Sequence, residues 1–196
     1  MMLDMVVTPP AILQSIEAET LALGFTRSCK YQTGSLLRML AATKPGGMLL
    51  ELGTGTGCGS AWLLEGMNRT ARLISVEQEE RYSLVAQRLL GTDRRATFLV
   101  QDAADFLRVQ KPASFDLIFA DTTAGKFMLL AETLALLKPG GLYVIDDLTP
   151  QEDWERDMPG HTERVEALVE TLERRADLLL TRMNWSSGLI VAARPG

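Results

Sequence analysis

A glycine-rich turn between an apolar run and a helical segment is the sequence feature that most constrains the fold of this chain. The apolar run Met48–Leu52 has strand character and leads into the sequence GTGTGCG, after which the chain resumes with helical character at Ser60. Glycines at alternate positions permit a sharp turn with positive φ and let a ligand approach the backbone closely. The next apolar run ends at Glu77, whose carboxylate can accept hydrogen bonds from both hydroxyls of a ribose. The separation of about 20 residues between the turn and this acid is typical of a nucleoside-binding βαβ unit, so the pattern indicates an adenosine-type cofactor.

The spacing of the glycines argues against a dinucleotide. The fingerprint G-x-G-x-x-G needs glycine at its sixth position, but that position is Cys58 when counted from Gly53 and Ser60 when counted from Gly55. The form E-x-G-x-G-x-G, which begins at Glu51, instead resembles motif I of class I S-adenosylmethionine-dependent methyltransferases. A nicotinamide-dependent oxidoreductase is therefore a weaker alternative, and a cofactor-binding module without catalysis is a third.

Length, charge and hydropathy narrow the class of protein further. A chain of 196 residues suits one domain, and the net charge of −5 argues against nucleic acid as a partner, because surfaces that bind phosphate backbones are usually basic. No apolar run approaches the ~18 residues of a membrane span, and the N-terminus has no signal-peptide pattern. We therefore expect a cytoplasmic protein that does not bind membranes.

Strand-like runs alternate with amphipathic helical segments along the chain, which predicts an α/β fold with a parallel sheet. The expected strands are residues 48–52, 72–76, 96–100, 115–120 and 142–145, and a helix is expected from Lys126 to Pro139. Two further runs, 177–183 and 188–194, are joined by NWSSG, a hairpin signal, and strands joined by a tight turn are antiparallel. This pattern predicts a Rossmann-like class I methyltransferase fold, with a seven-stranded, mostly parallel sheet and an antiparallel last strand. We expect a single methyltransferase domain over residues 1–196, with a helical cap over 1–45 and a Rossmann-like core over 46–196.

The stretch from Leu49 to Pro150 resembles the cation-dependent O-methyltransferase family that includes catechol and caffeoyl-coenzyme A O-methyltransferases. The strings that carry the resemblance are VEQEERYSLVAQRLL, FLVQDAADFL, FDLIFADTTAGKF and GGLYVIDD. The resemblance implies S-adenosylmethionine as cofactor, a small hydroxylated, catechol-like acceptor and a homodimer. Some bacterial members resemble RNA methyltransferases, an alternative that the acidic charge balance makes weaker.

The resemblance also implies the residues of the cofactor site. The glycine loop would line the methionine and the ribose, Glu77 would hold the ribose hydroxyls, and Gln78 would pack against the adenine. Asp102 and Ala103 would meet the adenine edge, although Asp102 is also placed to cap the helix that follows it. The expected cofactor-binding residues are Glu51, Gly53, Thr54, Gly55, Gly57, Ser60, Glu77, Gln78, Asp102, Ala103 and Asp121.

Three acids suggest a metal site. Asp121, Asp146 and Asp147 follow two strands expected to be neighbours, at the sheet edge where open α/β folds bind ligands. Three carboxylates repel one another unless a cation compensates, and oxygen ligands suit a divalent ion such as Mg²⁺. The resemblance implies that such an ion holds two vicinal oxygens of the acceptor, with Asp121 as the catalytic residue. A strand end in a solvated turn is the alternative explanation for Asp146 and Asp147.

The chain departs from the family pattern at the expected acceptor site. Ala124 stands where the family has its catalytic lysine, Asp147 replaces an asparagine, and Lys126 lies nearby but aligns with a different position. His161, the single histidine of the chain, is a general base at the mouth of the pocket, a helix-capping residue or a solvent-exposed side chain. We expect the acceptor pocket to be walled by the segment Trp154–His161 and by the N-terminal helical segment.

Overall fold

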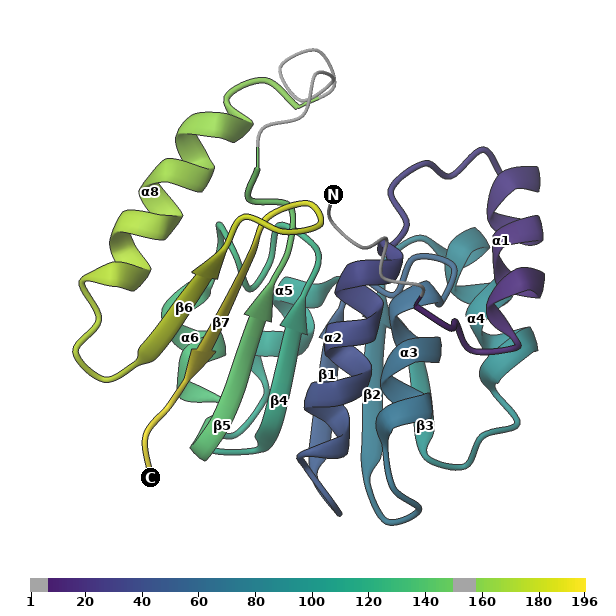
Figure 1. Cartoon of the computed structure of the whole chain (residues 1–196), viewed down its shortest axis with the longest axis horizontal. Helices are drawn as coiled ribbons and strands as arrows, with labels where there is room; N and C mark the ends of the chain where they lie inside the picture. The colour runs from purple at the N-terminus through teal and green to yellow at the C-terminus, as the bar shows by residue number, and fades with distance from the viewer. Residues whose placement is uncertain (1–6, 150–157) are drawn as a thin grey trace.

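The computed structural model of the chain describes residues 7–149 and 158–196. In these residues seven strands form one sheet, in the order β3-β2-β1-β4-β5-β7-β6 (Figure 1). The strands are β1 (Met48–Leu52), β2 (Arg72–Glu77), β3 (Ala96–Val100), β4 (Phe115–Ala120), β5 (Leu137–Ile145), β6 (Leu179–Met183) and β7 (Leu189–Ala193). The predicted positions of the strands are confirmed, with β5 beginning earlier than expected.

The strand directions also agree with the prediction. Parallel pairing joins β1 to both β2 and β4, β2 to β3, and β4 to β5. The terminal hairpin brings β7 into the sheet between β5 and β6, antiparallel to both. The predicted Rossmann-like methyltransferase architecture, with its antiparallel last strand, is therefore confirmed.

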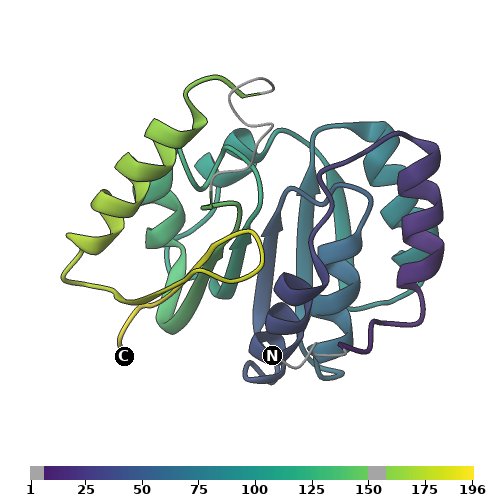
Figure 2. The same ribbon diagram turned by 45° about the horizontal axis from the view of Figure 1, so that its top comes forward.

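Helices cover both faces of the sheet. In Figures 1 and 2, α2 and α3 lie on one face, while α5 and α6 lie on the other. The helices are α1 (Leu13–Ala22), α2 (Tyr31–Ala42), α3 (Cys58–Gly66), α4 (Glu80–Leu90), α5 (Ala103–Arg108), α6 (Leu130–Ala135) and α8 (His161–Glu173). None of the helices in the described residues has the length and apolar character that a membrane span requires. The division into a cap over residues 1–45 and a core over 46–196 stays a prediction.

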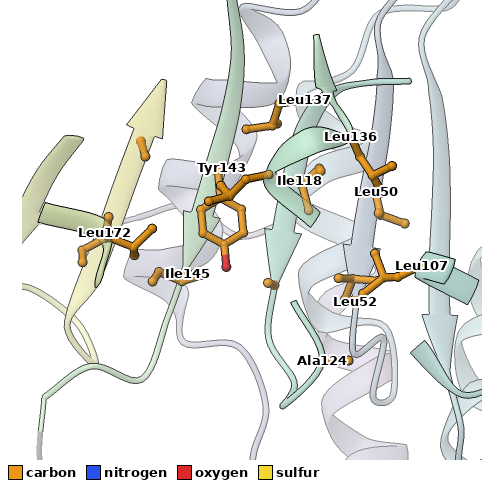
Figure 3. Close-up of a cluster of buried hydrophobic side chains, with 14 of the residues drawn as sticks. Leu50, Leu52, Leu107, Ile118, Ala124, Leu136, Leu137, Tyr143, Ile145 and Leu172 are labelled. Carbon is orange, nitrogen blue, oxygen red and sulfur yellow. The ribbon is translucent and has the colours of Figure 1, made fainter. Parts of the chain in front are cut away.

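The core consists of two layers, one on each face of the sheet. Leu50 and Leu52 of β1 enter one buried cluster together with residues of α5, α6 and α8, whereas Leu49 enters the other together with α1, α2 and α3. Successive side chains of a strand point to opposite faces, and a parallel sheet with helices on both sides buries both sets. Figure 3 shows the first cluster, in which Leu50, Ile118 and Tyr143 come from three neighbouring strands.

The helix expected from Lys126 to Pro139 is shorter in the structure. It covers only Leu130–Ala135, and Leu129 before it has a positive φ of 56°. The chain after this helix pairs with the sheet, because the backbone N–H of Phe115 donates to the carbonyl of Leu136. Lys126 consequently lies in a turn that follows β4, and not on a helix.

Candidate cofactor and acceptor site

The turn after β1 needs glycine for conformational and steric reasons. Gly53 has a φ of 94°, which L side chains rarely adopt. A Cβ atom added there would lie 2.7 Å from the backbone oxygen of Asp121. The loop therefore presses directly against the end of β4, and this contact places the loop beside the acids that follow β4 and β5.

Glu77 is held at the same edge by the loop itself. Its Oε2 accepts a hydrogen bond from the backbone N–H of Gly55 at 2.8 Å, and its Oε1 accepts one from that of Glu79 at 2.9 Å. Two backbone donors fix the carboxylate without neutralising it. This position agrees with the predicted contact to ribose hydroxyls, which stays a prediction.

A cavity of about 450 Å³ opens at the carboxyl ends of β1, β2 and β4. Such a volume falls within the ~300–1,000 Å³ common for small-molecule sites. The structure brings eight of the predicted residues to its lining: Glu51, Gly53, Thr54, Gly55, Glu77, Gln78, Asp121 and Asp147. Of the predicted residues that the structure describes, five lie outside this lining: Gly57, Ser60, Asp102, Ala103 and Asp146.

Two of these outlying residues have other partners. Ser60 is fully buried and donates a hydrogen bond to Glu51. Asp102 is the N-cap of α5, and its Oδ1 accepts from the backbone N–H of Asp105 at 3.0 Å. The capping role considered for Asp102 is therefore confirmed.

Glu51 is a buried acid in the wall of the cavity. It is 1% exposed, and its Oε2 accepts hydrogen bonds from the hydroxyls of Ser60 and Ser75. Burial raises the pKa of Glu51 to about 7, and the negative charge of Glu77 adds to the rise, although the two serine hydroxyls act in the opposite direction. Glu51 therefore gains or loses its proton close to neutral pH.

Asp121 lies where the glycine loop meets the end of β4. Burial raises the pKa of Asp121 well above its ordinary value, while the Lys126 ammonium opposes the rise. Asp147, Asp146 and Glu51 act in the same direction as burial. The acids of this sheet edge thus disfavour one another's ionisation, and a positive charge nearby relieves that repulsion.

The segment between α1 and α2 closes part of the cavity, as expected for the N-terminal part of the chain, although sequence reasoning did not identify the residues that do so. Phe25 and Arg27 line the cavity, and the Phe25 ring packs on Tyr82 with 4.5 Å between centroids. The Arg27 Nη1 atom lies 3.8 Å from the sulfur of Met158. Segments that are distant in the sequence thus meet over the site, and no local pattern could have revealed this contact.

The opposite side of the cavity combines aromatic and basic groups. Phe127 packs edge-on against His161, with 5.3 Å between ring centroids, and the Arg164 guanidinium lies 5.4 Å from the Phe127 centroid. Burial lowers the pKa of His161, although a hydrogen bond with the backbone of Asp147 opposes the shift. As predicted for this wall, Met158 and His161 line the cavity, whereas Trp154 lies outside the described residues.

The three aspartates expected to bind a cation do not converge on one position. The Asp146 side chain is 3% exposed, and its Oδ1 accepts from the Ser187 hydroxyl and from the backbone N–H of Asp147 at 2.7 Å. Only Asp121 and Asp147 of the three line the cavity. Within residues 7–149 and 158–196, no group of three His, Cys, Asp or Glu side chains could hold a metal ion. The described residues therefore do not fit the predicted Mg²⁺ site, since a centre with three carboxylate ligands needs at least one oxygen of each carboxylate to face the ion.

Ala124, which stands where the family has its lysine, is part of the hydrophobic core. Its side chain is 8% exposed and packs in the same buried cluster as Leu52, as Figure 3 shows. A lysine there would place a charge in an apolar core. The amine of this turn is supplied two residues later, by Lys126, which lines the cavity.

The comparisons with known proteins agree with this geometry. A family model described as a methyltransferase domain matches residues 50–148, just over half of the chain. The protein named "Putative O-methyltransferase" of Mycobacterium sp. (strain JLS) is 31% identical over 117 residues, which are 57% of this chain and 53% of that protein. A protein of the same name from Mycolicibacterium vanbaalenii is 31% identical over 57% of this chain and 52% of its own length. The chain thus spans about half the length of these relatives.

Solved structures show the same fold at lower identity. The O-methyltransferase from Bacillus cereus in complex with S-adenosylhomocysteine is 20% identical, covers 97% of this chain and 94% of its own, and has a TM-score of 0.82. The O-methyltransferase TomG from Streptomyces achromogenes, in complex with S-adenosylmethionine, is 23% identical, with coverages of 98% and 93% and a TM-score of 0.81. These two structures align over nearly the whole of this chain and share its fold. The family match includes the glycine loop, Glu77 and the aspartates after β4 and β5. The chain therefore belongs to the methyltransferase domain family.

Proposed function

We propose that the chain is an S-adenosylmethionine-dependent O-methyltransferase that acts on a small hydroxylated acceptor. The observation that carries the proposal is the cavity, whose lining combines the glycine loop and Glu77 with Lys126, Phe127 and His161. Bound S-adenosylmethionine would supply an electrophilic methyl group on a positively charged sulfur. The relatives named as O-methyltransferases support oxygen as the atom that is methylated.

The cofactor side of the cavity has the chemistry that this molecule requires. Glu77 is held by two backbone donors, and its carboxylate lines the cavity, where it would accept hydrogen bonds from ribose hydroxyls. The carboxyl groups of Glu51 and Asp121 also line the cavity, where a cationic ligand would favour their ionised forms. The described residues therefore fit the cofactor.

The acceptor side suits a compact aromatic molecule. Phe127 and Met158 offer apolar contact, and Lys126 and Arg164 offer positive charge beside it. Holding an acceptor oxygen in line with the cofactor's methyl group is worth many orders of magnitude in rate. A catechol-like acceptor satisfies these contacts. The net charge of −5 favours it over RNA, the second candidate of the same family.

Calorimetric titration with S-adenosylhomocysteine tests the cofactor, with NAD as the competing ligand. We expect Glu77→Ala to weaken S-adenosylhomocysteine binding by ~1–3 kcal/mol, the worth of charge-assisted hydrogen bonds. Glu80→Ala is the matched control, because Glu80 is an exposed acid in the first turn of α4 and should change nothing. Equal affinities for wild type and Glu77→Ala would refute the contact between Glu77 and the ribose. Binding of NAD in place of S-adenosylhomocysteine would refute the proposed function. Transfer of a labelled methyl group to catechol and caffeate then tests the acceptor class.

A further inference from the structure

Lys126 is a buried lysine in a turn that the fold fixes firmly. Its side chain is only 5% exposed, and lysine is almost never buried to this degree without a partner. Gly125, the preceding residue, has a φ of 89°, and a Cβ there would lie 2.6 Å from Leu52. The hydroxyl of Tyr143 donates to the carbonyl of Gly125. The turn is thus clamped between β1 and β5, and it holds the lysine side chain in a buried position.

The ammonium group lies between the ends of β4 and β5. Its Nζ donates to the backbone carbonyl of Asp146 at 3.2 Å and lies 3.9 Å from Oδ1 of Asp121. An ammonium group has three N–H donors, so these two contacts leave a donor for a ligand in the cavity that Lys126 lines. The positive charge therefore sits at the point where the acceptor is expected to place its oxygen.

This location is the one predicted for the divalent cation. Of the three expected ligands only Asp121 and Asp147 line the cavity, and the Lys126 ammonium already lies 3.9 Å from Oδ1 of Asp121. The third expected ligand, Asp146, is 3% exposed and does not line the cavity. We propose that the Lys126 ammonium takes the place of the divalent cation and stabilises the acceptor oxygen, so that methyl transfer does not require a metal ion. This inference rests on the proposed function.

The transfer step balances without a metal. A phenolic acceptor binds beside the ammonium as its oxyanion, after releasing its proton to solvent water, because a neighbouring positive charge favours the ionised form. A lone pair of this oxygen then forms the new O–C bond to the methyl carbon. The C–S bond breaks and its electron pair stays on sulfur, which gives a neutral thioether and a methyl ether. The charges of nucleophile and sulfonium cancel, while Lys126 keeps its proton throughout.

Binding of Mn²⁺ tests the inference without any acceptor. Protein saturated with S-adenosylhomocysteine is titrated with Mn²⁺, and free ion is measured by electron paramagnetic resonance. We expect no stoichiometric uptake by the wild type. Uptake of one ion that Asp121→Asn abolishes would overturn the inference while S-adenosylhomocysteine binding still supported the proposed function. Failure to bind S-adenosylhomocysteine would instead refute the proposed function itself.

The rate of methyl transfer to catechol tests whether the positive charge of Lys126 stabilises the acceptor oxygen. We expect activity to survive excess chelator, and Lys126→Met to lower kcat by about 100-fold, as expected when one group that stabilises a developing charge is removed. S-adenosylhomocysteine affinity should stay unchanged, and Lys126→Arg should recover part of the rate. Lys111→Met, on an exposed lysine, controls for the substitution. Loss of activity with chelator, or full activity in Lys126→Met, would overturn the inference. If the wild type binds S-adenosylhomocysteine but does not methylate catechol, the Mn²⁺ titration alone decides whether the site binds a metal ion.

Discussion

The buried carboxyl group of Glu51 makes the stability of the protein depend on pH, and replacing Glu51 with glutamine should remove that dependence. Burial raises the pKa of Glu51 from 4.5 to about 7. An acid whose pKa is raised by folding keeps its proton longer in the folded state than in the unfolded state. The free energy of unfolding therefore falls as the pH rises from about 4.5 to about 7, because unfolding then allows the acid to ionise.

The size of the effect follows from the pKa shift. One pKa unit corresponds to about 1.36 kcal/mol, so the full contribution is roughly 3 kcal/mol. About 2 kcal/mol of it is lost between about pH 5 and about pH 7.5, since both values lie near the ends of the window. Glutamine keeps an oxygen that can accept from Ser75, which in the wild type donates to Glu51 at 2.6 Å. It has no proton to lose in this range.

Urea unfolding of both proteins at the two pH values measures this difference. We expect the wild type to lose about 2 kcal/mol more than Glu51→Gln over this interval. Burial also raises the pKa of Asp121 and of Asp146. Both acids contribute in the same direction in both proteins. The difference between the two proteins therefore reports Glu51 together with its effect on the pKa of Asp121. Glu166→Gln, on an exposed position of α8, should behave as the wild type does. Identical pH profiles for wild type and Glu51→Gln would refute the raised pKa.

Three further substitutions test the loop, the helix cap and the core. Gly53→Ala should destabilise the protein and weaken S-adenosylhomocysteine binding by more than about 10-fold, because its Cβ would meet the Asp121 backbone at 2.7 Å. Gly24→Ala is the control, because Gly24 also has a positive φ but a Cβ there would have no atom within 4 Å. An equal loss of affinity in both variants would contradict the role of the contact between the loop and Asp121. Asp102→Ala should lower the free energy of unfolding, measured in urea, by about 1 kcal/mol, because the N-cap of α5 is lost. Weaker binding of S-adenosylhomocysteine by this variant would show that Asp102 also contacts the adenine. Trp62→Ala, at a fully buried position, should cost ~3–5 kcal/mol, and a loss below about 1 kcal/mol would contradict the packing of α3.

The sequence predicted those parts of the fold that depend on local patterns. The apolar runs of β1 to β4 are long enough, and bounded well enough, to define each strand. The loop NWSSG predicted the hairpin, and the hairpin predicted the antiparallel β7. In the site, the glycine loop and Glu77 could be identified because both belong to one βαβ unit with a fixed spacing.

The remaining features depend on contacts between segments that are distant in the sequence. Asp146 was expected to face a metal ion, but its carboxylate accepts from Ser187, 41 residues away. Lys126 was placed on a helix, because its neighbours are apolar and helix-forming; the positive φ values of Gly125 and Leu129 place it in a turn instead. Arg27 meets Met158 across the cavity. Spacing along the chain carries no information about any of these pairs.

The position of β7 in the sheet has a consequence for synthesis of the protein. β7 follows β6 in the sequence but lies between β5 and β6, so β5 has no hydrogen-bonding neighbour on that side until β7 leaves the ribosome. Val144 and Ile145 of β5, which pair with β7 in the finished sheet, then belong to an open apolar edge, the kind that recruits other chains. We therefore expect nascent chains that stop before Leu189 to aggregate or to be held by chaperones, and the complete sheet to form only after β7 has been synthesised.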